Sequence, residues 1–152
     1  MPKMHDEEDD EEFEDDEFDE HERRVAAILG QTDLEVTGKT VKQYLDYLKP
    51  QLELPCRLTG IEDFPWEERY VFGFGDEKEY ERLKKTQPSY TDTFELLRFA
   101  AATANDGVLV EVERVSDKKK FTLPLADLEA VDEKSKNHQL LDDYAVWFVN
   151  YR

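Results

Sequence analysis

Cysteine and histidine are scarce in this sequence of 152 residues, which holds one cysteine and three histidines. Cys56 has no partner, so no disulfide can form within the chain, and nothing here requires an oxidising compartment. Its place in an alternating apolar series favours a buried structural thiol over a nucleophile. Zinc sites need several thiolates or imidazoles and are therefore not expected.

The few histidines also argue against catalysis. His5 and His21 lie in the acidic N-terminal segment, which leaves His138 as the single histidine of the remaining chain. No grouping of Ser, Cys and His for nucleophilic catalysis can be built from it. Gly73-Phe74-Gly75 is too short for a phosphate-binding fingerprint, because no Gly or Lys follows it at the required spacing, and it fits a strand end better. We expect that the protein is not an enzyme.

Basic residues are few, with 20 Lys and Arg against 38 Asp and Glu, and the formal net charge is −18. Residues 1–22 hold fourteen acidic residues against Lys3, which gives −13 and leaves −5 for the other 130 residues. Nucleic acid is not an expected partner, because phosphate binding depends on Lys and Arg. A cation or a basic protein surface fits this charge better.

Long apolar runs are also absent. No run approaches the roughly 18 residues that a membrane-spanning helix needs. The acidic N-terminus is the opposite of the basic start of a signal peptide. We therefore expect a soluble, cytoplasmic protein that has no membrane as a partner.

The charge pattern divides the chain into three parts. Residues 1–22 are of low complexity and cannot bury enough apolar surface to fold, so we expect a disordered acidic tail. Residues 23–55 predict a short helical lead-in, and residues 56–152 predict an α+β domain. This domain is the part expected to bind a ligand.

Helices are predicted where apolar residues recur at helical spacing: over residues 21–29, from Thr37 or Thr40 to Pro50, and over residues 77–85. Strands are predicted by alternating or aromatic-rich runs at residues 52–58, 66–74, 93–99, 108–115 and 121–123. The last two runs form the clearest hairpin, with its turn at residues 116–119.

The C-terminal residues 137–152 fit both a helix and a strand, and we expect a helical turn followed by a strand. Trp66 and Trp147 are expected in the core, because each lies among aromatic and β-branched residues. The whole pattern predicts a small curled antiparallel sheet or a partial barrel, of which an SH3-like barrel is one form, with a few short helices.

Residues 61–68 stand out because four carboxylates lie within seven residues between aromatic anchors. Carboxylates that are held close together repel one another, and a hard cation such as Ca²⁺, which takes six to eight oxygen ligands, would relieve the repulsion. A solvated charged loop is the alternative. No segment matches the twelve-residue EF-hand loop, so any calcium site must be assembled otherwise.

The candidate metal ligands are Glu62, Asp63, Glu67, Asp142 and Asp143, with Glu62 and Asp63 as the first choice. Further candidates are acids in the same loop or in predicted turns: Glu68, Asp117, Asp127 and Asp132. If residues 66–74 form a strand, Glu67 and Glu68 point to opposite faces and would not bind one ion. For Asp142 and Asp143, the alternative is a pair of solvated charges at a helix end.

Four segments, taken together, resemble the calcium-binding protein family typified by cyanobacterial CcbP: residues 59–68, 84–92, 114–129 and 140–150. The resemblance covers roughly residues 40–152 and leaves the acidic tail outside. It implies a small, acidic, bacterial α+β protein that binds Ca²⁺ without EF-hands and acts as a buffer or sequestering protein.

The alternative is a protein-interaction module whose acidic tail recruits a basic partner, and a hydrolase with paired carboxylates ranks third. A metal titration separates the first two. A geometric site binds Ca²⁺ stoichiometrically and prefers it to Mg²⁺, which demands a tighter octahedron. A polyanionic tail binds either ion weakly and in a salt-sensitive manner.

Overall fold

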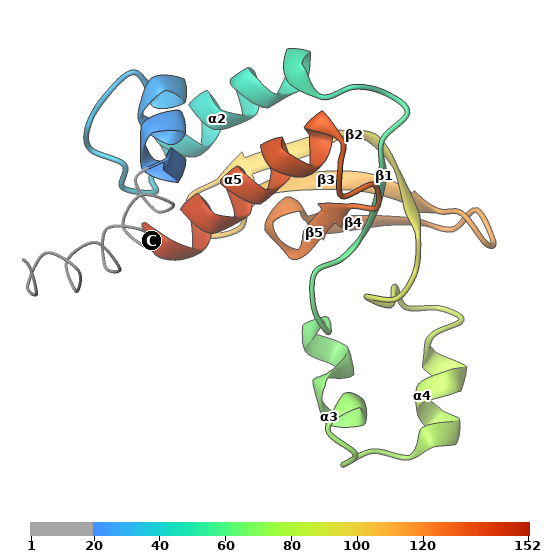
Figure 1. Cartoon of the computed structure of the whole chain (residues 1–152). Helices are drawn as coiled ribbons and strands as arrows, with labels where there is room; N and C mark the ends of the chain where they lie inside the picture. The colour runs from blue at the N-terminus through green and yellow to red at the C-terminus, as the bar shows by residue number, and fades with distance from the viewer. Residues whose placement is uncertain (1–19) are drawn as a thin grey trace, which may run out of the picture.

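The computed structural model describes residues 20–152, which form one open, five-stranded antiparallel sheet with helices packed on it (Figure 1). The strand order is β4-β3-β2-β1-β5. The bounds of the strands are Arg57–Gly60 for β1, Phe94–Thr103 for β2, Gly107–Arg114 for β3, Lys120–Pro124 for β4 and Leu128–Ala130 for β5. The predicted α+β class with a small antiparallel sheet is therefore confirmed, and the sheet does not close into a barrel.

Residues 1–19 of the predicted acidic tail lie outside the described residues. Its last residues, 20–22, belong to the first helix, which runs through residues 20–29. This helix ends before Gly30, whose φ of +67° is the left-handed conformation common after a helix. No helix within residues 20–152 has the length and apolar character needed to span a bilayer.

Helix α2 (Gly38–Gln51) begins where the sequence predicts, at the N-cap Thr37. The Thr37 hydroxyl accepts a hydrogen bond from the Thr40 N–H at 3.1 Å, and the Thr40 hydroxyl accepts one from the Thr37 N–H at 2.8 Å. Such reciprocal bonds satisfy backbone donors that a helix start leaves free. Buried side chains of the first helix and of α2 pack into the same core as the sheet. The division of the chain into a helical lead-in and an α+β domain after residue 55 stays a prediction.

The C-terminal segment is a single helix, α5 (Lys136–Asn150), so the predicted strand in this segment is wrong. Leu141, Tyr144 and Phe148 recur at helical spacing and are all buried, and this periodicity outweighs the strand-like composition. Helices α2 and α5 lie side by side on one face of the sheet (Figure 1). Trp147 is 1% exposed, as predicted, and its indole N–H donates to the Leu34 carbonyl at 2.6 Å.

The first strand is shorter than predicted, because β1 begins at Arg57 rather than Leu52. The backbone of Glu53 bonds to a side chain of α5 and not to a strand: its N–H donates to Asn137 Oδ1 at 2.9 Å, and its carbonyl accepts from Asn137 Nδ2 at 2.8 Å. The alternating pattern there is incomplete, since Leu54 is 71% exposed.

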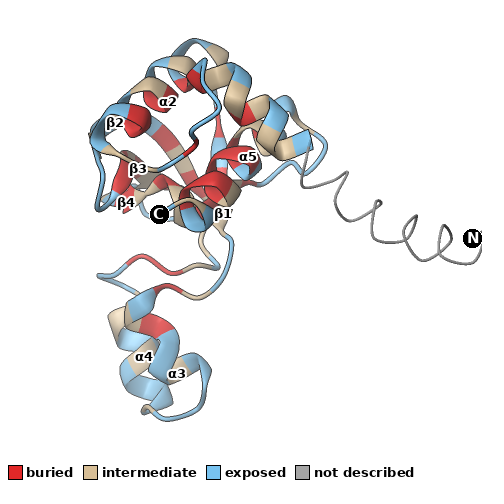
Figure 2. Cartoon of the chain, turned by 90° about the vertical axis from the view of Figure 1, so that its left-hand side faces the viewer, coloured by how far each residue is buried: buried red, intermediate tan, exposed pale blue. Residues whose placement is uncertain are grey.

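The predicted strand at residues 66–74 is also wrong. The chain forms a 3₁₀ turn, η1 (Pro65–Glu67), then the short helices α3 (Glu68–Val71) and α4 (Glu77–Leu83). Figures 1 and 2 show α3 and α4 as a projection that stands away from the sheet, with mostly exposed residues. Turn η1 begins at a proline, which suits the first position of a helical turn and not a central strand.

Trp66 lies where the projection joins the body and is only partly buried, so its predicted place in the core is corrected. Its indole N–H donates to the Pro88 carbonyl at 2.6 Å. Its ring lies 5.7 Å from Tyr80 and 6.2 Å from Tyr70, and these two tyrosines stack on each other at 5.0 Å. Trp66 therefore belongs to an aromatic cluster that holds the projection together.

Candidate metal site

The turn that follows β1 is fixed at both of its sides. The Gly60 N–H donates to the Tyr90 carbonyl at 3.0 Å, and the Ile61 N–H donates to the Asp127 carbonyl at 3.0 Å. A side chain at residue 60 would place its Cβ 2.6 Å from the Tyr90 Cβ, so only glycine fits there. These contacts set residues 61–63 beside the 3₁₀ turn η2 (Leu125–Asp127).

A cavity of about 420 Å³ lies between residues 61–68, η2 and α5. Five of the residues that line it carry carboxylates: Glu62, Asp63, Glu68, Asp127 and Asp142. Asn150 adds an amide, and the other lining residues are apolar: Ile61, Pro65, Ala126, Ala145, Val146 and Val149. We name this the acidic cavity.

No Lys, Arg or His is among the lining residues of the acidic cavity, and within residues 20–152 Asp142 is the one of its carboxylates that lies within 4.0 Å of a basic side chain, that of His21. Burial, and then the charge of Glu62, raise the pKa of Asp127 above its ordinary value. The donor groups are carboxylates and one amide, with no thiol or imidazole. Hard cations such as Ca²⁺ prefer this oxygen-rich set, so the residues present fit a calcium ion.

The structure brings three of the five predicted ligands, Glu62, Asp63 and Asp142, to this one cavity. Two of the further candidates, Glu68 and Asp127, join them. Asn150 was not predicted, because an amide at a helix end carries no charge signal in the sequence. The two remaining predicted ligands, Glu67 and Asp143, have other surroundings.

Glu67 is fully buried and is not among the residues that line the acidic cavity. It accepts three hydrogen bonds, from the Phe64 N–H at 3.2 Å, the Tyr90 N–H at 3.0 Å and the Tyr80 hydroxyl at 3.2 Å. These donors occupy both of its oxygens and tie η1 to the loop before β2 and to α4. The prediction that Glu67 and Glu68 point to opposite faces depended on a strand at residues 66–74, where the structure has helical turns; Glu68 lines the acidic cavity and Glu67 does not.

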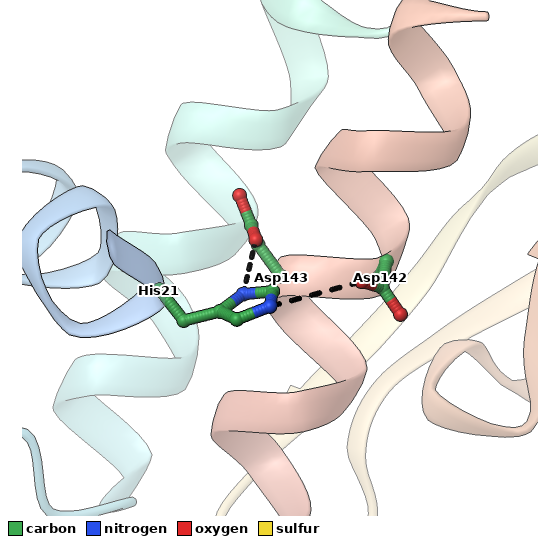
Figure 3. A group of neighbouring side chains, drawn as sticks. All are labelled: His21, Asp142 and Asp143. Atoms are coloured by element: carbon green, nitrogen blue, oxygen red, sulfur yellow. Dashed lines mark ion pairs between the residues drawn. The ribbon is translucent and has the colours of Figure 1, made fainter. Parts of the chain in front are cut away.

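Asp143 belongs to an ion-pair network between α5 and the first helix (Figure 3). Arg24 donates to its two oxygens at 2.7 and 3.0 Å, and His21 Nδ1 lies 2.5 Å from Oδ1. Within residues 20–152, His21, Asp142 and Asp143 are the one group of three metal-ligating side chains whose ligand atoms lie within 4.8 Å of one another. Arg24 already neutralises Asp143, so this network suits Ca²⁺ less well than the acidic cavity does.

Asp142 connects these two regions. It lines the acidic cavity, and its Oδ2 lies 4.0 Å from His21 Nε2. Its side chain is 54% exposed, so it can turn toward an ion in the cavity without breaking a buried contact.

The turn acids Asp117 and Asp132 are engaged elsewhere. Asp117 accepts hydrogen bonds from Arg114 at 3.0 and 2.8 Å, and these bonds lower the pKa of its carboxyl to about 2. Asp132 accepts from the Lys134 N–H at 3.0 Å within its own turn. Neither lines the acidic cavity.

Comparison with known proteins gives a family and a fold. Residues 66–148, more than half of the chain, match the profile of a CcbP-type family described as calcium binding. No curated protein matches the sequence. Of the five carboxylates of the acidic cavity, this matched segment contains those of Glu68, Asp127 and Asp142.

Two solved structures share the fold. The crystal structure of Anabaena CcbP is 20% identical, with a TM-score of 0.55 over 85% of this chain and 89% of that one. A calcium-binding protein in its calcium-binding form is also 20% identical, with a TM-score of 0.54 over the same shares. With a sequence identity of 20%, these structural similarities show a common fold.

Proposed function

Because the chain belongs to the CcbP family of calcium-binding proteins, we propose that it holds Ca²⁺ in the acidic cavity. The observation that carries the proposal is the gathering of five carboxylates around about 420 Å³ with no basic side chain in the lining. Folding these groups together costs free energy through their mutual repulsion. A bound cation offsets that cost.

Glu62, Asp63 and Asp142 are the proposed principal ligands, with Asp127 and the Asn150 amide oxygen beside them. Ca²⁺ takes six to eight oxygens in a flexible geometry, so water completes the shell that these groups begin. The ligands come from the turn after β1, from η2 and from α5. An ion held among them would therefore fasten three separate segments to one another.

The proposed role is that of a buffer, in which binding and releasing the ion is itself the activity. Ca²⁺ in the acidic cavity would be bound stoichiometrically, while the acidic residues before residue 20 would attract cations only by charge. A binding experiment on the full chain must therefore separate stoichiometric binding in the cavity from attraction to the acidic residues by charge alone.

Calorimetric titration of the full chain with Ca²⁺ and with Mg²⁺ tests the proposal. We expect one stoichiometric phase for Ca²⁺ that persists in salt of about 0.5 M, where exposed charges are strongly screened, and no such phase for Mg²⁺. Asp63→Asn and Asp142→Asn should each remove this phase. Asp106→Asn is the matched control, since Asp106 is exposed in the turn between β2 and β3.

The control variant makes the same charge change away from the cavity and should keep the salt-resistant phase. If all three variants retain it, the acidic cavity does not hold the ion. If the wild type shows only salt-sensitive binding of either ion, the acidic residues bind cations as a polyanion and the proposed site does not exist.

A protein-interaction role is the second candidate, favoured by the tip of the projection. Val71, Phe72 and Phe74 are 41, 66 and 80% exposed there. Contiguous exposed apolar residues on a soluble protein commonly mark a contact surface. Affinity capture with the wild type and with the Phe72→Ser, Phe74→Ser double variant tests this role. If the tip of the projection is a contact surface, the wild type should retain a partner protein that the double variant does not.

A further inference from the structure

The ion-pair network between the first helix and α5 places one carboxylate at each ring nitrogen of His21 (Figure 3). Nδ1 lies 2.5 Å from Asp143 Oδ1, and Nε2 lies 4.0 Å from Asp142 Oδ2. The two carboxylates differ in burial, because the side chain of Asp143 is 5% exposed and that of Asp142 is 54% exposed. They can therefore act on the imidazole in different ways.

Asp143 is held in place behind the imidazole. Arg24 donates to its two oxygens at 2.7 and 3.0 Å, so the carboxylate is fixed in one orientation. A carboxylate beside Nδ1 favours the tautomer of His21 that carries its proton on that nitrogen. The lone pair of the ring is then on Nε2, which faces Asp142. Metal-binding histidines are commonly oriented by a carboxylate in this manner.

The opposite side of the imidazole is open to solvent. The side chain of His21 is 27% exposed, so an ion can approach Nε2 and the exposed Asp142 carboxylate without breaking a buried contact. With metal–ligand bonds of about 2.1 Å, two ligand atoms on a tetrahedral ion lie about 3.4 Å apart. The present separation of 4.0 Å must shorten by about 0.6 Å, which a rotation of the Asp142 side chain can supply.

The network also carries an excess of negative charge. Its three carboxylates are those of Glu20, Asp142 and Asp143, and Arg24 is the one guanidinium that pairs with them within residues 20–152. With a neutral imidazole the balance is −2, which a divalent cation would offset. In the sequence, the acidic segment leads directly into His21, and its charge raises the concentration of divalent cations nearby.

The donor atoms select a different class of ion from the acidic cavity. An imidazole nitrogen beside a carboxylate suits Zn²⁺, Co²⁺ or Ni²⁺, whereas Ca²⁺ takes oxygen ligands. A closed structural zinc site needs four protein ligands, and the sequence predicts none. The arrangement at His21 is instead open, with two protein ligands and water in the other positions, so an ion there would exchange with solvent.

We propose that His21 Nε2 and the Asp142 carboxylate bind a divalent transition-metal ion of the Zn²⁺ class, with Asp143 as the positioning residue. The ion would join the start of the first helix to α5. Binding at His21 does not require calcium in the acidic cavity, although Asp142 lines both sites. The alternative is that the network is an ion pair only.

Zn²⁺ is the probe, and it is titrated into the ¹⁵N-labelled full chain at about pH 8, above the ordinary pKa of histidine. An excess of Mg²⁺ is present to occupy the acidic residues that attract cations by charge alone. NMR spectra of the imidazole nitrogens follow each histidine separately. We expect Zn²⁺ to shift Nε2 of His21 and to leave the ring nitrogens of His138 in place.

Matched variants assign the binding, which is measured from amide shifts in α5. His21→Gln should weaken Zn²⁺ binding at least about tenfold, and His5→Gln, the same change elsewhere in the acidic segment, should leave it unchanged. Asp142→Asn should weaken it about tenfold. Asp63→Asn removes a proposed calcium ligand and should keep Zn²⁺ binding, so the two proposed sites can fail independently.

The role of Asp143 is read from the metal-free protein. The same imidazole spectra should show the proton of His21 on Nδ1, and Asp143→Asn should increase the share of the tautomer that carries it on Nε2. A loss of stability alone would not change this ratio. The proposal is overturned if Zn²⁺ leaves Nε2 of His21 unshifted, if the His21 and His5 variants weaken binding alike, or if Asp142→Asn binds as the wild type does.

Discussion

The Glu67 carboxylate accepts a hydrogen bond from the Tyr90 N–H at 3.0 Å, and so joins two loops that are 23 residues apart in the chain. The same carboxylate accepts from the Phe64 N–H and the Tyr80 hydroxyl, at 3.2 Å each. One buried acid therefore holds together the start of the projection, its second helix and the base of the acidic cavity. Its role is structural support next to the acidic cavity, where we propose that calcium binds.

Glu67→Gln tests this support. A Gln side chain keeps one oxygen to accept from the two backbone N–H groups and can donate its NH₂ group to the Tyr80 hydroxyl, but it replaces hydrogen bonds to a charged acceptor by weaker neutral ones. We expect a loss of about 1–3 kcal/mol in the free energy of unfolding, measured in urea with a calcium chelator. Glu81→Gln, an exposed change on α4, is the control and should cost less than about 0.5 kcal/mol. Equal effects of the two variants would contradict the supporting role of Glu67.

Gly107, at the start of β3, provides a test of close packing against α5. Its φ is +67°, and an added Cβ would lie 2.5 Å from the Tyr144 hydroxyl oxygen and 2.8 Å from Phe148 Cε1. Gly30 has the same φ with nothing within 4 Å. Gly30→Ala should therefore cost about 1 kcal/mol from backbone strain alone, and Gly107→Ala about 3 kcal/mol from strain and overpacking together. Thermal unfolding measures both, and similar losses would show that the contact with α5 yields readily.

The two tryptophans should differ in their effect on stability. Trp147 is 1% exposed within the core, so Trp147→Ala should destabilise the protein by about 3–5 kcal/mol. Trp66 is only partly buried at the base of the projection, so Trp66→Ala should cost about 2 kcal/mol. Chemical denaturation of both variants gives the comparison. A larger loss at residue 66 would mean that the aromatic cluster of the projection stabilises the fold more than the main core does.

The ion pair between Arg114 and Asp117 predicts a pH dependence. Arg114 lowers the pKa of the Asp117 carboxyl from an ordinary value near 4 to about 2 in the folded protein. An acid with a lowered folded pKa stabilises the fold above its unfolded pKa, and this stabilisation is lost as the pH falls through the folded value. The stability difference between wild type and Asp117→Asn should therefore be full at pH 5 and vanish on acidification between about pH 4 and pH 2. A difference that stays constant over this range would contradict the assignment.

Elements whose residue pattern fits only one type of secondary structure are predicted correctly from the sequence. The hairpin of β3 and β4 followed from strict alternation, and α2 from its cap at Thr37 and its apolar spacing. The sequence predicts strands at residues 66–74 and at the end of residues 137–152, because aromatic and β-branched residues suit strands and buried helices alike. Tertiary contacts decided these two segments: α5 buries Trp147 against α2, and Trp66 packs among the tyrosines of the projection.

The candidate site was predictable to the extent that it is local. Glu62 and Asp63 are adjacent acids in a turn between a glycine and an aromatic anchor, and the sequence shows this directly. That Asp127 and Asp142 face them follows from the pairing of β1 with β5 and the packing of α5, which no local pattern encodes. The burial of Glu67 was hidden for the same reason, since its partner Tyr90 is distant in sequence.

Asp127 gives the sharpest test of the acidic cavity, because calcium should reverse the sign of one substitution. Burial, and then the charge of Glu62, raise the pKa of Asp127 in the folded protein. An acid with a raised folded pKa destabilises the fold once it ionises, so this cost is absent below its unfolded pKa and grows as the pH rises through the folded value. Asp127→Asn removes the charge and should stabilise the calcium-free protein at pH 7, but not at about pH 3.

Calcium should invert this order. At a free concentration 100 times the dissociation constant, linkage stabilises the wild type by about 2.7 kcal/mol, and a variant that lacks one ligand gains less. In melting curves at pH 7, Asp127→Asn should unfold above the wild type with chelator and below it with saturating Ca²⁺. Asp106→Asn, the exposed control, should follow the wild type in both conditions. If Asp127→Asn also unfolds above the wild type in saturating Ca²⁺, Asp127 is a repulsive neighbour of the cavity and not a ligand of its ion.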